Sequence, residues 1–433
     1  MPGVKTSEIT SWIISKGLAG EPEQRLLGDF CERLIASGVP LLRANIGQRT
    51  LHPIVDGLEF EWWRGGGARE DEWHREDIGA DEDLLRYPFH YMYTAGLSRL
   101  RQRLGDERRP LEFPLFDDLR ARGATDYFAV ATGFGQPGEV GPLSGFSSSW
   151  TTDAPGGFND EDIATIELLL PALALAIKAR STERAASTVL ETYLGRDVGH
   201  RVLGGEIGRG SAEAIRAVLW YADLEGFTKI ADTAAQAELI DLLNAYFGCM
   251  VDVVHDHGGQ VLKFIGDGLL AIFRLDQDDG ASMRALEAVA VVTARVEALN
   301  ENRAHGRKPT SGFHIALHLG EVLYGNVGGR DRLDFTVVGA AVNEVSRIED
   351  MCRPLGRNVL LSASFAEATR GRTDRVVSLG RYALRGIAAP RELYTVIAAD
   401  DPGHGAHADR RGVRPPDLAD ADVGRAGRHE AAL

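Results

Sequence analysis

The sequence predicts two consecutive α+β domains joined by a helical connector, and three observations lead to this. The chain has 433 residues, which is more than one ordinary hydrophobic core holds. Residues 212–399 alternate apolar strands with amphipathic helices, whereas residues 1–180 mix short apolar or aromatic runs with glycine-rich turns. Between them, in residues 181–211, apolar side chains recur every three or four positions, as in a helix.

The composition is that of a globular, acidic protein. Hydrophobic residues make up 44% of the chain and charged residues 26%, so a packed core is expected. The net charge of −15 excludes broad electrostatic attraction to nucleic acid or anionic lipid, and we expect no partner of either kind. Cys31, Cys249 and Cys352 show no metal-ligand spacing, which indicates buried thiols in a reducing compartment.

The N-terminus and the most apolar stretch of the chain do not suggest a secretion signal or a membrane span. The N-terminus lacks the basic region and apolar run of a secretion signal. The most apolar stretch, 166–179, contains Pro171 and is shorter than the roughly 20 residues that cross a bilayer. We therefore expect a cytoplasmic protein without a membrane span. Residues 400–433 are rich in Asp, Ala, Gly, Arg and His without apolar periodicity, which predicts a disordered tail.

The first domain is expected to begin with a weakly ordered segment over 1–25. Strands are predicted within Leu58–Trp63 and Asp126–Thr132, and a long helix over 160–180, capped by the acidic phrase GGFNDED. This arrangement resembles a GAF domain over 40–178, and the resemblance implies a sensor or regulatory domain that acts through the connector.

Aromatic residues suggest where such a domain would bind an unknown small-molecule regulator. They are Trp62, Trp63, Trp73, Tyr87, His90, Tyr91 and Tyr93. The same residues also fit an ordinary distribution of core and surface aromatics.

The second domain shows a regular order of elements, which predicts an α+β sandwich. Strands are expected over 214–221, 260–265, 269–273, 312–318, 321–327 and 333–338, with helices over 235–257, 281–299 and 341–352. A Gly-Asp-Gly turn separates the second and third of these strands, which is typical of a hairpin.

Two acidic residues stand where these strands end. Asp223 closes the first strand and Asp267 occupies the tip of the hairpin, so antiparallel pairing would bring both carboxylates to one end of the sheet. Such a pair suits magnesium or manganese bound to phosphates. The alternative is that each Asp only favours the turn backbone. Gly226, Phe227 and Thr228 open the next helix with free amides that suit a triphosphate.

A third segment adds a helix with two polar residues on one face. Asn343 and Arg347 are four residues apart, so the guanidinium could reach a phosphate while the amide bonds a ribose. An exposed, solvated helix face is the alternative.

Together with ALHLGEVLYGNVG (316–328), these segments resemble the catalytic domain of class III adenylyl and guanylyl cyclases over about 185 residues. The resemblance implies a ferredoxin-like antiparallel sheet with helices. It assigns Asp223 and Asp267 to two divalent ions (Mg²⁺ or Mn²⁺), with Leu224 in the same metal site. One ion would lower the pKa of the ribose 3′-hydroxyl, and the other would neutralise the β- and γ-phosphates.

By the same resemblance, Asn343 orients the ribose and Arg347 stabilises charge on the α-phosphate. Arg385 stands where the family has a phosphate-binding lysine. Because the family's site forms between two catalytic domains and this chain carries both halves, the resemblance implies a homodimer through the catalytic domain.

Two positions bear on the choice of base. By the resemblance, Lys263 matches the family's purine-reading position, where its ammonium group can donate to adenine N1. Thr336 matches the second base-reading position of the family, where its hydroxyl can accept from the adenine amino group. The pair favours ATP over GTP. One departure is the alanine at position 340, where the family commonly has Asp, which puts only the local loop geometry in doubt.

The expected function is therefore that of an adenylate cyclase. A guanylate cyclase and a catalytically silent cyclase-like scaffold are the alternatives. His314 and His318 alternate on one strand, and without a third ligand in the sequence they are assigned to strand packing.

Overall fold

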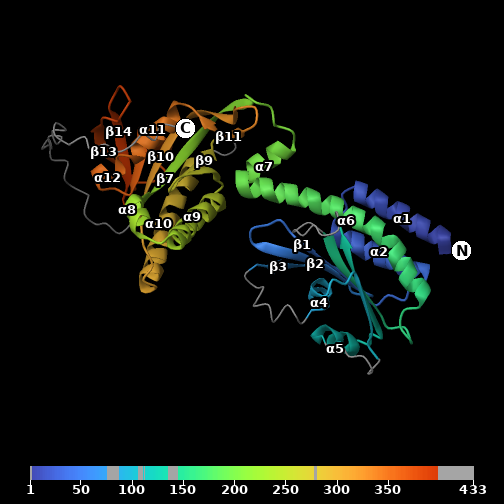
Figure 1. Ribbon diagram of the computed structural model, residues 1–433. Coiled ribbons are helices and arrows are strands. Elements are labelled where there is room, and N and C mark those ends of the chain that lie inside the picture. The colour runs from blue at the N-terminus through green and yellow to red at the C-terminus, as the bar shows by residue number, and fades with distance from the viewer. Residues whose placement is uncertain are drawn as a thin grey trace.

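The computed structural model describes residues 2–75, 87–105, 111, 113–134, 145–276 and 280–397, so the tail expected over 400–433 lies outside the described residues. Each half of the chain forms its own sheet with its own helices (Figure 1). Within the described part of the chain, no helix has both the length and the apolarity needed to cross a bilayer.

The N-terminal sheet has six antiparallel strands in the order β3-β2-β1-β6-β5-β4. The strands are β1 (Arg43–Arg49), β2 (Val55–Trp63), β3 (Gly67–His74), β4 (Arg99–Arg103), β5 (Asp126–Gly133) and β6 (Gly145–Thr152). The helices are α1 (Pro2–Leu18), α2 (Glu23–Ser37), α4 (Pro88–Thr94), α5 (Pro114–Ala121) and α6 (Asp160–Leu194). Residues of α1, α2 and α6 form one core with the sheet, and residues of α4 and α5 form a second.

Residues 2–18 form the helix α1 and residues 23–37 the helix α2, which corrects the expectation of a weakly ordered segment over 1–25. Helix α1 lies against α6, and Ile13 is fully buried between them. A Cβ on Gly17 would approach the Ala176 Cβ to 2.8 Å, so a residue without a side chain lets the two helices meet closely.

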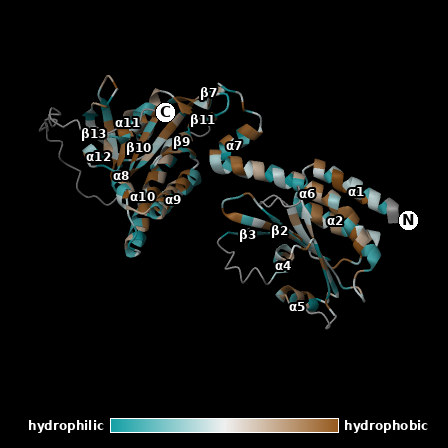
Figure 2. Ribbon diagram, in the orientation of Figure 1, coloured by the Kyte–Doolittle hydropathy of each residue, from teal (hydrophilic) through white to brown (hydrophobic). Residues whose placement is uncertain are grey.

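Helix α6 continues through the expected boundary at 180/181 and ends only at Leu194. Its N-terminus carries the expected cap, since the Asn159 side chain accepts from the backbone of Glu161 and Asp162. A short helix, α7 (Arg196–Leu203), follows and ends at Gly204. Most of the connector is therefore helical. Its first part, residues 181–194, is the C-terminal end of α6, the same helix that closes the first domain. Figure 2 shows apolar and polar residues alternating along α6.

The second sheet has the order β13-β14-β12-β10-β7-β9-β8, with β11 paired to β10. Its strands are β7 (Ala212–Glu225), β8 (Gln260–Ile265), β9 (Gly268–Arg274), β10 (Gly312–Gly328), β11 (Leu333–Val338), β12 (Val359–Ser362), β13 (Val376–Tyr382) and β14 (Arg391–Val396). The helices are α8 (Phe227–Thr233), α9 (Gln236–Asp256), α10 (Ala281–His305), α11 (Ala340–Glu349), α12 (Cys352–Leu355) and α13 (Ala363–Ala368). All pairs are antiparallel except β10 with β12.

Different helices pack on the two faces of this sheet. Helices α9 and α10 pack on one face with Trp220 and Phe273, whereas α11 and the start of α7 pack on the other with Leu219 and Val345. Because side chains alternate along β7, the odd-numbered Asp223 lies on the α11 face. The expected strands 312–318 and 321–327 are in fact one strand, β10.

The cysteines and the surface charges fit the composition. All three cysteines are free, and Cys31 and Cys352 are fully buried, while Cys249 is half-buried.

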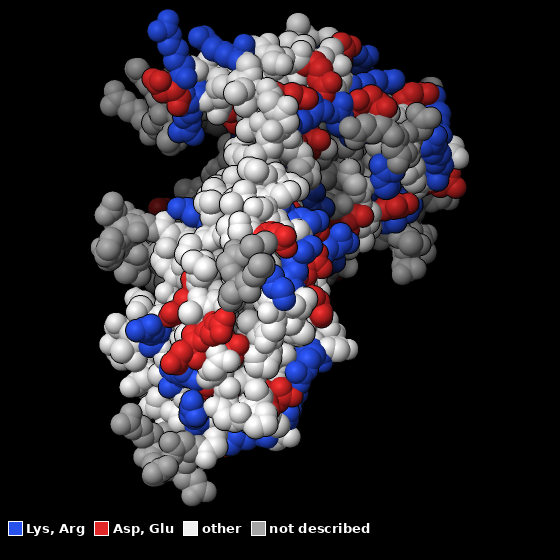
Figure 3. All heavy atoms as spheres, turned by 90° about the vertical axis from the view of Figure 1, so that its right-hand side faces the viewer, with Lys and Arg blue, Asp and Glu red and all other residues white. Residues whose placement is uncertain are grey.

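On the face seen in Figure 3, Lys and Arg side chains are interspersed with Asp and Glu side chains. This face therefore presents no broad basic surface.

Candidate active site

The two aspartates lie together at one end of the second sheet. Asp223 is inside β7 rather than after it, because the strand runs on to Glu225. Asp267 is in the turn between β8 and β9, and β9 pairs with β7 up to Ala222 and Leu269. A Cβ on Gly268 would lie 3.0 Å from the Ala222 carbonyl oxygen and 3.1 Å from Asp223 Oδ1, so the missing side chain lets the hairpin turn lie close to this carboxylate.

A third carboxylate, that of Glu349, faces the same point and was not predicted from the sequence. It ends α11, is 8% exposed, and its Oε1 lies 3.5 Å from His314 Nδ1. Burial, together with the negative charges of Asp267 and Glu349, raises the pKa of Asp223 to about 7. Burial also raises the pKa of Asp267, with Glu349 adding to it.

These carboxylates form a donor set that suits a cation. Burial, and after it the neighbouring carboxylates, raise the pKa values of Asp223 and Asp267, as expected where a fold places acidic groups close together. No cluster of three or more His, Cys, Asp or Glu with metal-ligand geometry occurs among the described residues. Two carboxylates with substrate phosphates as further ligands are the arrangement magnesium commonly uses, so Asp223 and Asp267 fit the ions that the sequence implies.

Replacing Asp223 with asparagine is expected to stabilise the metal-free protein at pH 8 and to leave it nearly unchanged at pH 4. Because the folded pKa of about 7 lies above the ordinary 3.8, the native state binds more protons than the unfolded state between these values, and stability falls as pH rises through this window. We expect a gain of roughly 1–2 kcal/mol at pH 8, allowing for partial solvent screening. Thermal unfolding of both proteins in the presence of a chelator, at pH 8 and at pH 4, measures this gain in stability. An equal gain at pH 4 would contradict the raised pKa of Asp223.

A second group of polar residues lies where β8 approaches β11. Lys263 Nζ donates to Asp334 Oδ2 at 3.1 Å. Thr336, two residues further along β11, is 6% exposed, and its Oγ1 has no hydrogen-bond partner among the described residues. The strands that carry the expected base-reading pair therefore approach each other, although β8 and β11 are not paired in the sheet. Asp334, which the sequence reasoning missed, holds the lysine there.

Asn343 and Arg347 lie on α11, as expected. Asn343 is exposed, while Arg347 Nη1 donates to Asp350 Oδ2 at 3.0 Å. Their helix is the one that brings Glu349 to the aspartates, since α11 packs across β7 and β10. Arg385 is exposed in the loop between β13 and β14.

After Asp223 the chain leaves β7 and turns at Gly226 into the short helix α8. The Leu224 side chain packs on the opposite, α9 face of the sheet, so only its backbone is shared with the aspartate. Gly226 adopts a left-handed φ of 70° and precedes α8, which begins with Phe227 and Thr228. The expected loop-to-helix turn is therefore present next to Asp223.

His314 and His318 are buried in β10, as strand packing predicts, and His314 pairs across the sheet with Asp223. Its contact with Glu349 joins α11 to the strand that lies beside the aspartate. The histidine is therefore closer to the candidate site than its sequence pattern suggested.

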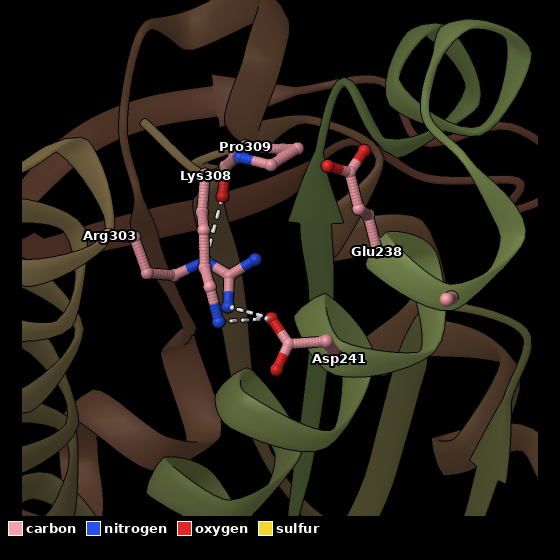
Figure 4. A pocket seen from close by; sticks show the side chains of 6 residues that line it. Glu238, Asp241, Arg303, Lys308 and Pro309 are labelled. Carbon is pink, nitrogen blue, oxygen red and sulfur yellow. Dashed lines mark hydrogen bonds and ion pairs between the residues drawn. The ribbon is translucent and has the colours of Figure 1, made fainter. Parts of the chain in front are cut away.

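A cavity of about 200 Å³ lies apart from these residues, between α9 and the loop after α10 (Figure 4). Asp241 accepts from Arg303 Nη1 at 2.9 Å and from Lys308 Nζ at 3.3 Å, and Arg303 Nε donates to the Pro309 carbonyl at 2.7 Å. The charges of Asp241, Arg303 and Lys308 are thus paired with one another, and these contacts tie α9 to the loop after α10.

Comparison with known proteins identifies the second half of the chain. Residues 212–398 match the adenylate and guanylate cyclase catalytic domain family. An adenylate cyclase of Anabaena cylindrica is 33% identical over 159 residues, 36% of this chain and 31% of that protein. Adenylate cyclase 1 of Rhizobium meliloti is 24% identical over 251 residues, 57% of this chain and 38% of that protein.

Solved structures similar to the chain include the adenylyl cyclase CyaB from P. aeruginosa, with 25% identity and a TM-score of 0.38 over 44% of this chain and 98% of that one. The guanylyl cyclase Cya2 has 28% identity and a TM-score of 0.39 over 45% and 97%. The chain spans about a third of the length of the two adenylate cyclases. The match to the adenylate and guanylate cyclase catalytic domain family thus covers the whole of the second sheet and the helices α8 to α13.

Proposed function

We propose that the protein is an adenylate cyclase, which converts ATP to 3′,5′-cyclic AMP and pyrophosphate. The observation that carries the proposal is the convergence of Asp223 and Asp267 beside the Gly268 turn, in a domain of the cyclase family. In this proposal the two carboxylates hold the divalent ions. When bound, these ions would activate the ribose 3′-hydroxyl and neutralise the triphosphate.

The chain's own residues would position the substrate. Arg347 would direct its planar guanidinium at the α-phosphate, where negative charge develops, and Asn343 would hold the ribose. Arg385, exposed in its loop, would bind the outer phosphates once the substrate is present. The backbone amides of Gly226, Phe227 and Thr228, at the start of α8, would also bind these phosphates.

Residues on β8 and β11 favour adenine over guanine as the base of the substrate. The buried Thr336 hydroxyl lacks a partner among the described residues, and an adenine amino group would supply one. Lys263 is held near it by Asp334 and can donate to adenine N1. Two of the curated relatives, those from Anabaena cylindrica and Rhizobium meliloti, are named as adenylate cyclases, which agrees with this choice.

We further propose that two copies of the chain form the active sites, with the aspartates from one subunit and Asn343 and Arg347 from its partner. The two pairs lie in a single chain, so a symmetric dimer would have two equivalent sites. The N-terminal half would regulate them through α6 and α7. Tyr324 of β10 donates to Asp197 of α7 at 2.9 Å, a direct contact between the connector and the catalytic sheet.

The test is an assay of the purified full-length protein with ATP or GTP, each with Mg²⁺ or Mn²⁺, in which mass spectrometry identifies the product. Cyclic AMP from ATP alone is the expected result. Cyclic GMP as the main product would replace the proposal with a guanylate cyclase. No product with either nucleotide or metal, from protein that binds ATP, would favour the silent scaffold.

A further inference from the structure

The connector helix α7 is tied to the catalytic sheet by one guanidinium group, that of Arg201. Its Nε donates to Asp197 at 3.1 Å, its Nη1 to Glu206 at 3.2 Å and its Nη2 to Glu213 at 3.0 Å. Asp197 belongs to α7 itself, Glu206 follows the helix, and Glu213 lies at the start of β7. All three nitrogens of the planar fork are therefore used, which fixes the orientation of the group.

The same guanidinium lies over two aromatic rings of the hairpin formed by β10 and β11. Its Cζ is 5.4 Å from the centre of the Tyr324 ring and 5.9 Å from that of Phe335. The two rings meet edge to face at 4.8 Å, and both residues are buried. A guanidinium within about 6 Å of a ring is attracted to it, so Arg201 holds both rings of this hairpin.

Phe335 belongs to the strand that carries the candidate base-reading groups. Side chains alternate along β11, so Asp334 and Thr336 lie on one face and Phe335 and Val337 on the other. In the described part of the chain, β11 pairs with β10 alone. Because hydrogen bonds hold this strand along one edge only, its position depends strongly on the packing of Phe335 and Val337, which are both buried.

The contacts of Arg201 are remote from the candidate metal ligands along the chain. Glu213 stands at the start of β7 and Asp223 near its end, ten residues further on. This separation corresponds to roughly 33 Å of extended strand. A change at Arg201 should therefore affect the base-reading strand without altering the carboxylates that would hold the ions.

We propose that Arg201 is a positioning residue for base recognition. Through the rings of Tyr324 and Phe335 it fixes β11, and with this strand the adenine-reading Thr336. Arg201 itself does not touch the substrate. The inference rests on the proposed adenylate cyclase activity, and it names the contacts by which α7 acts on the substrate site.

The first test is hydrogen–deuterium exchange of the full-length protein, which needs neither nucleotide nor activity. In Arg201→Gln the backbone amides of β11 are expected to exchange at least about fivefold faster than in the wild type, while those of β12 keep their rate. Arg201→Lys keeps the charge but loses the planar fork, so an intermediate rate is expected. The matched control is Arg196→Gln, which removes the same charge from an exposed position on the same helix and is expected to exchange as the wild type does.

The second test is steady-state kinetics with ATP and GTP. Arg201→Gln is expected to raise KM for ATP at least about fivefold and to lower the preference for ATP over GTP, with kcat changed by less than about twofold. Phe335→Leu is expected to act in the same direction. The double variant should raise KM by clearly less than the product of the two single effects, because both changes remove the same contact.

Faster exchange in all strands alike, or unchanged exchange in β11, would overturn the proposal, since Arg201 would then serve general stability or nothing at all. Unchanged KM and base preference in an active Arg201→Gln variant would overturn it as well, as would single effects that multiply fully in the double variant. If the wild type formed no cyclic nucleotide, the proposed function would fail. Exchange in β11 and the affinity for ATP in isothermal titration calorimetry would still decide the role of Arg201.

Discussion

Replacing Asp223 with alanine is expected to reduce cyclic nucleotide formation by at least about a thousandfold, because positioning and charge neutralisation by the ions contribute several kcal/mol to the barrier. The fold is expected to remain intact. Asp223 is only half-buried, and the change relieves the repulsion by Asp267 and Glu349 that raises its pKa. Initial rates with saturating Mn²⁺ and ATP, with circular dichroism as the check on folding, measure both effects.

The matched control is Asp252→Asn. Asp252 is exposed on α9, which covers the opposite face of the sheet, so the change removes one negative charge without touching the site. This variant is expected to keep the wild-type rate. If the Asp223 variant also kept most of its activity, the assignment of the metal site to this carboxylate would be wrong.

Replacing Lys263 with glutamate is expected to reduce kcat/KM for ATP by at least about a hundredfold, because adenine N1 loses its donor and faces an acceptor instead. The single change also sets two carboxylates against each other, since Lys263 Nζ now lies 3.1 Å from Asp334 Oδ2. The new glutamate should therefore be displaced from the base position.

Adding Asp334→Asn removes that repulsion, and the double variant is expected to use GTP better than the Lys263→Glu variant does. Asp334→Asn alone is the control and is expected to lower the preference for ATP only slightly. Measurement of kcat/KM for both nucleotides decides the matter. An unchanged ratio of ATP to GTP in the double variant would show that Lys263 does not read the base.

The sequence was sufficient to locate the aspartates, because strand and hairpin patterns place Asp223 and Asp267 at the same edge. It was not sufficient for Glu349. That residue follows a polar stretch of helix and resembles a solvated carboxylate, and only the packing of α11 across β7 buries it beside the aspartates. Tertiary contacts of this kind leave no periodic signal in the chain.

Glycines account for part of the remaining difference. Gly320 separated two expected strands, yet β10 runs through it without a break. A Cβ there would lie 2.6 Å from the Ala341 Cβ, so the glycine serves close packing against α11 rather than a turn. Gly17 in α1 has the same role against Ala176. A glycine in a sequence does not reveal which of these roles it has.

The central claim, a cyclase site shared between two copies of the chain, is tested most directly by mixing two inactive variants. Asp223→Ala and Arg347→Ala are each expected to be inactive alone. If subunits exchange, half of the dimers in an equal mixture combine both variants and carry one intact site, so about a quarter of the wild-type activity is expected. Activity that stays at the level of the separate variants, although labelled subunits demonstrably exchange, would contradict the shared site.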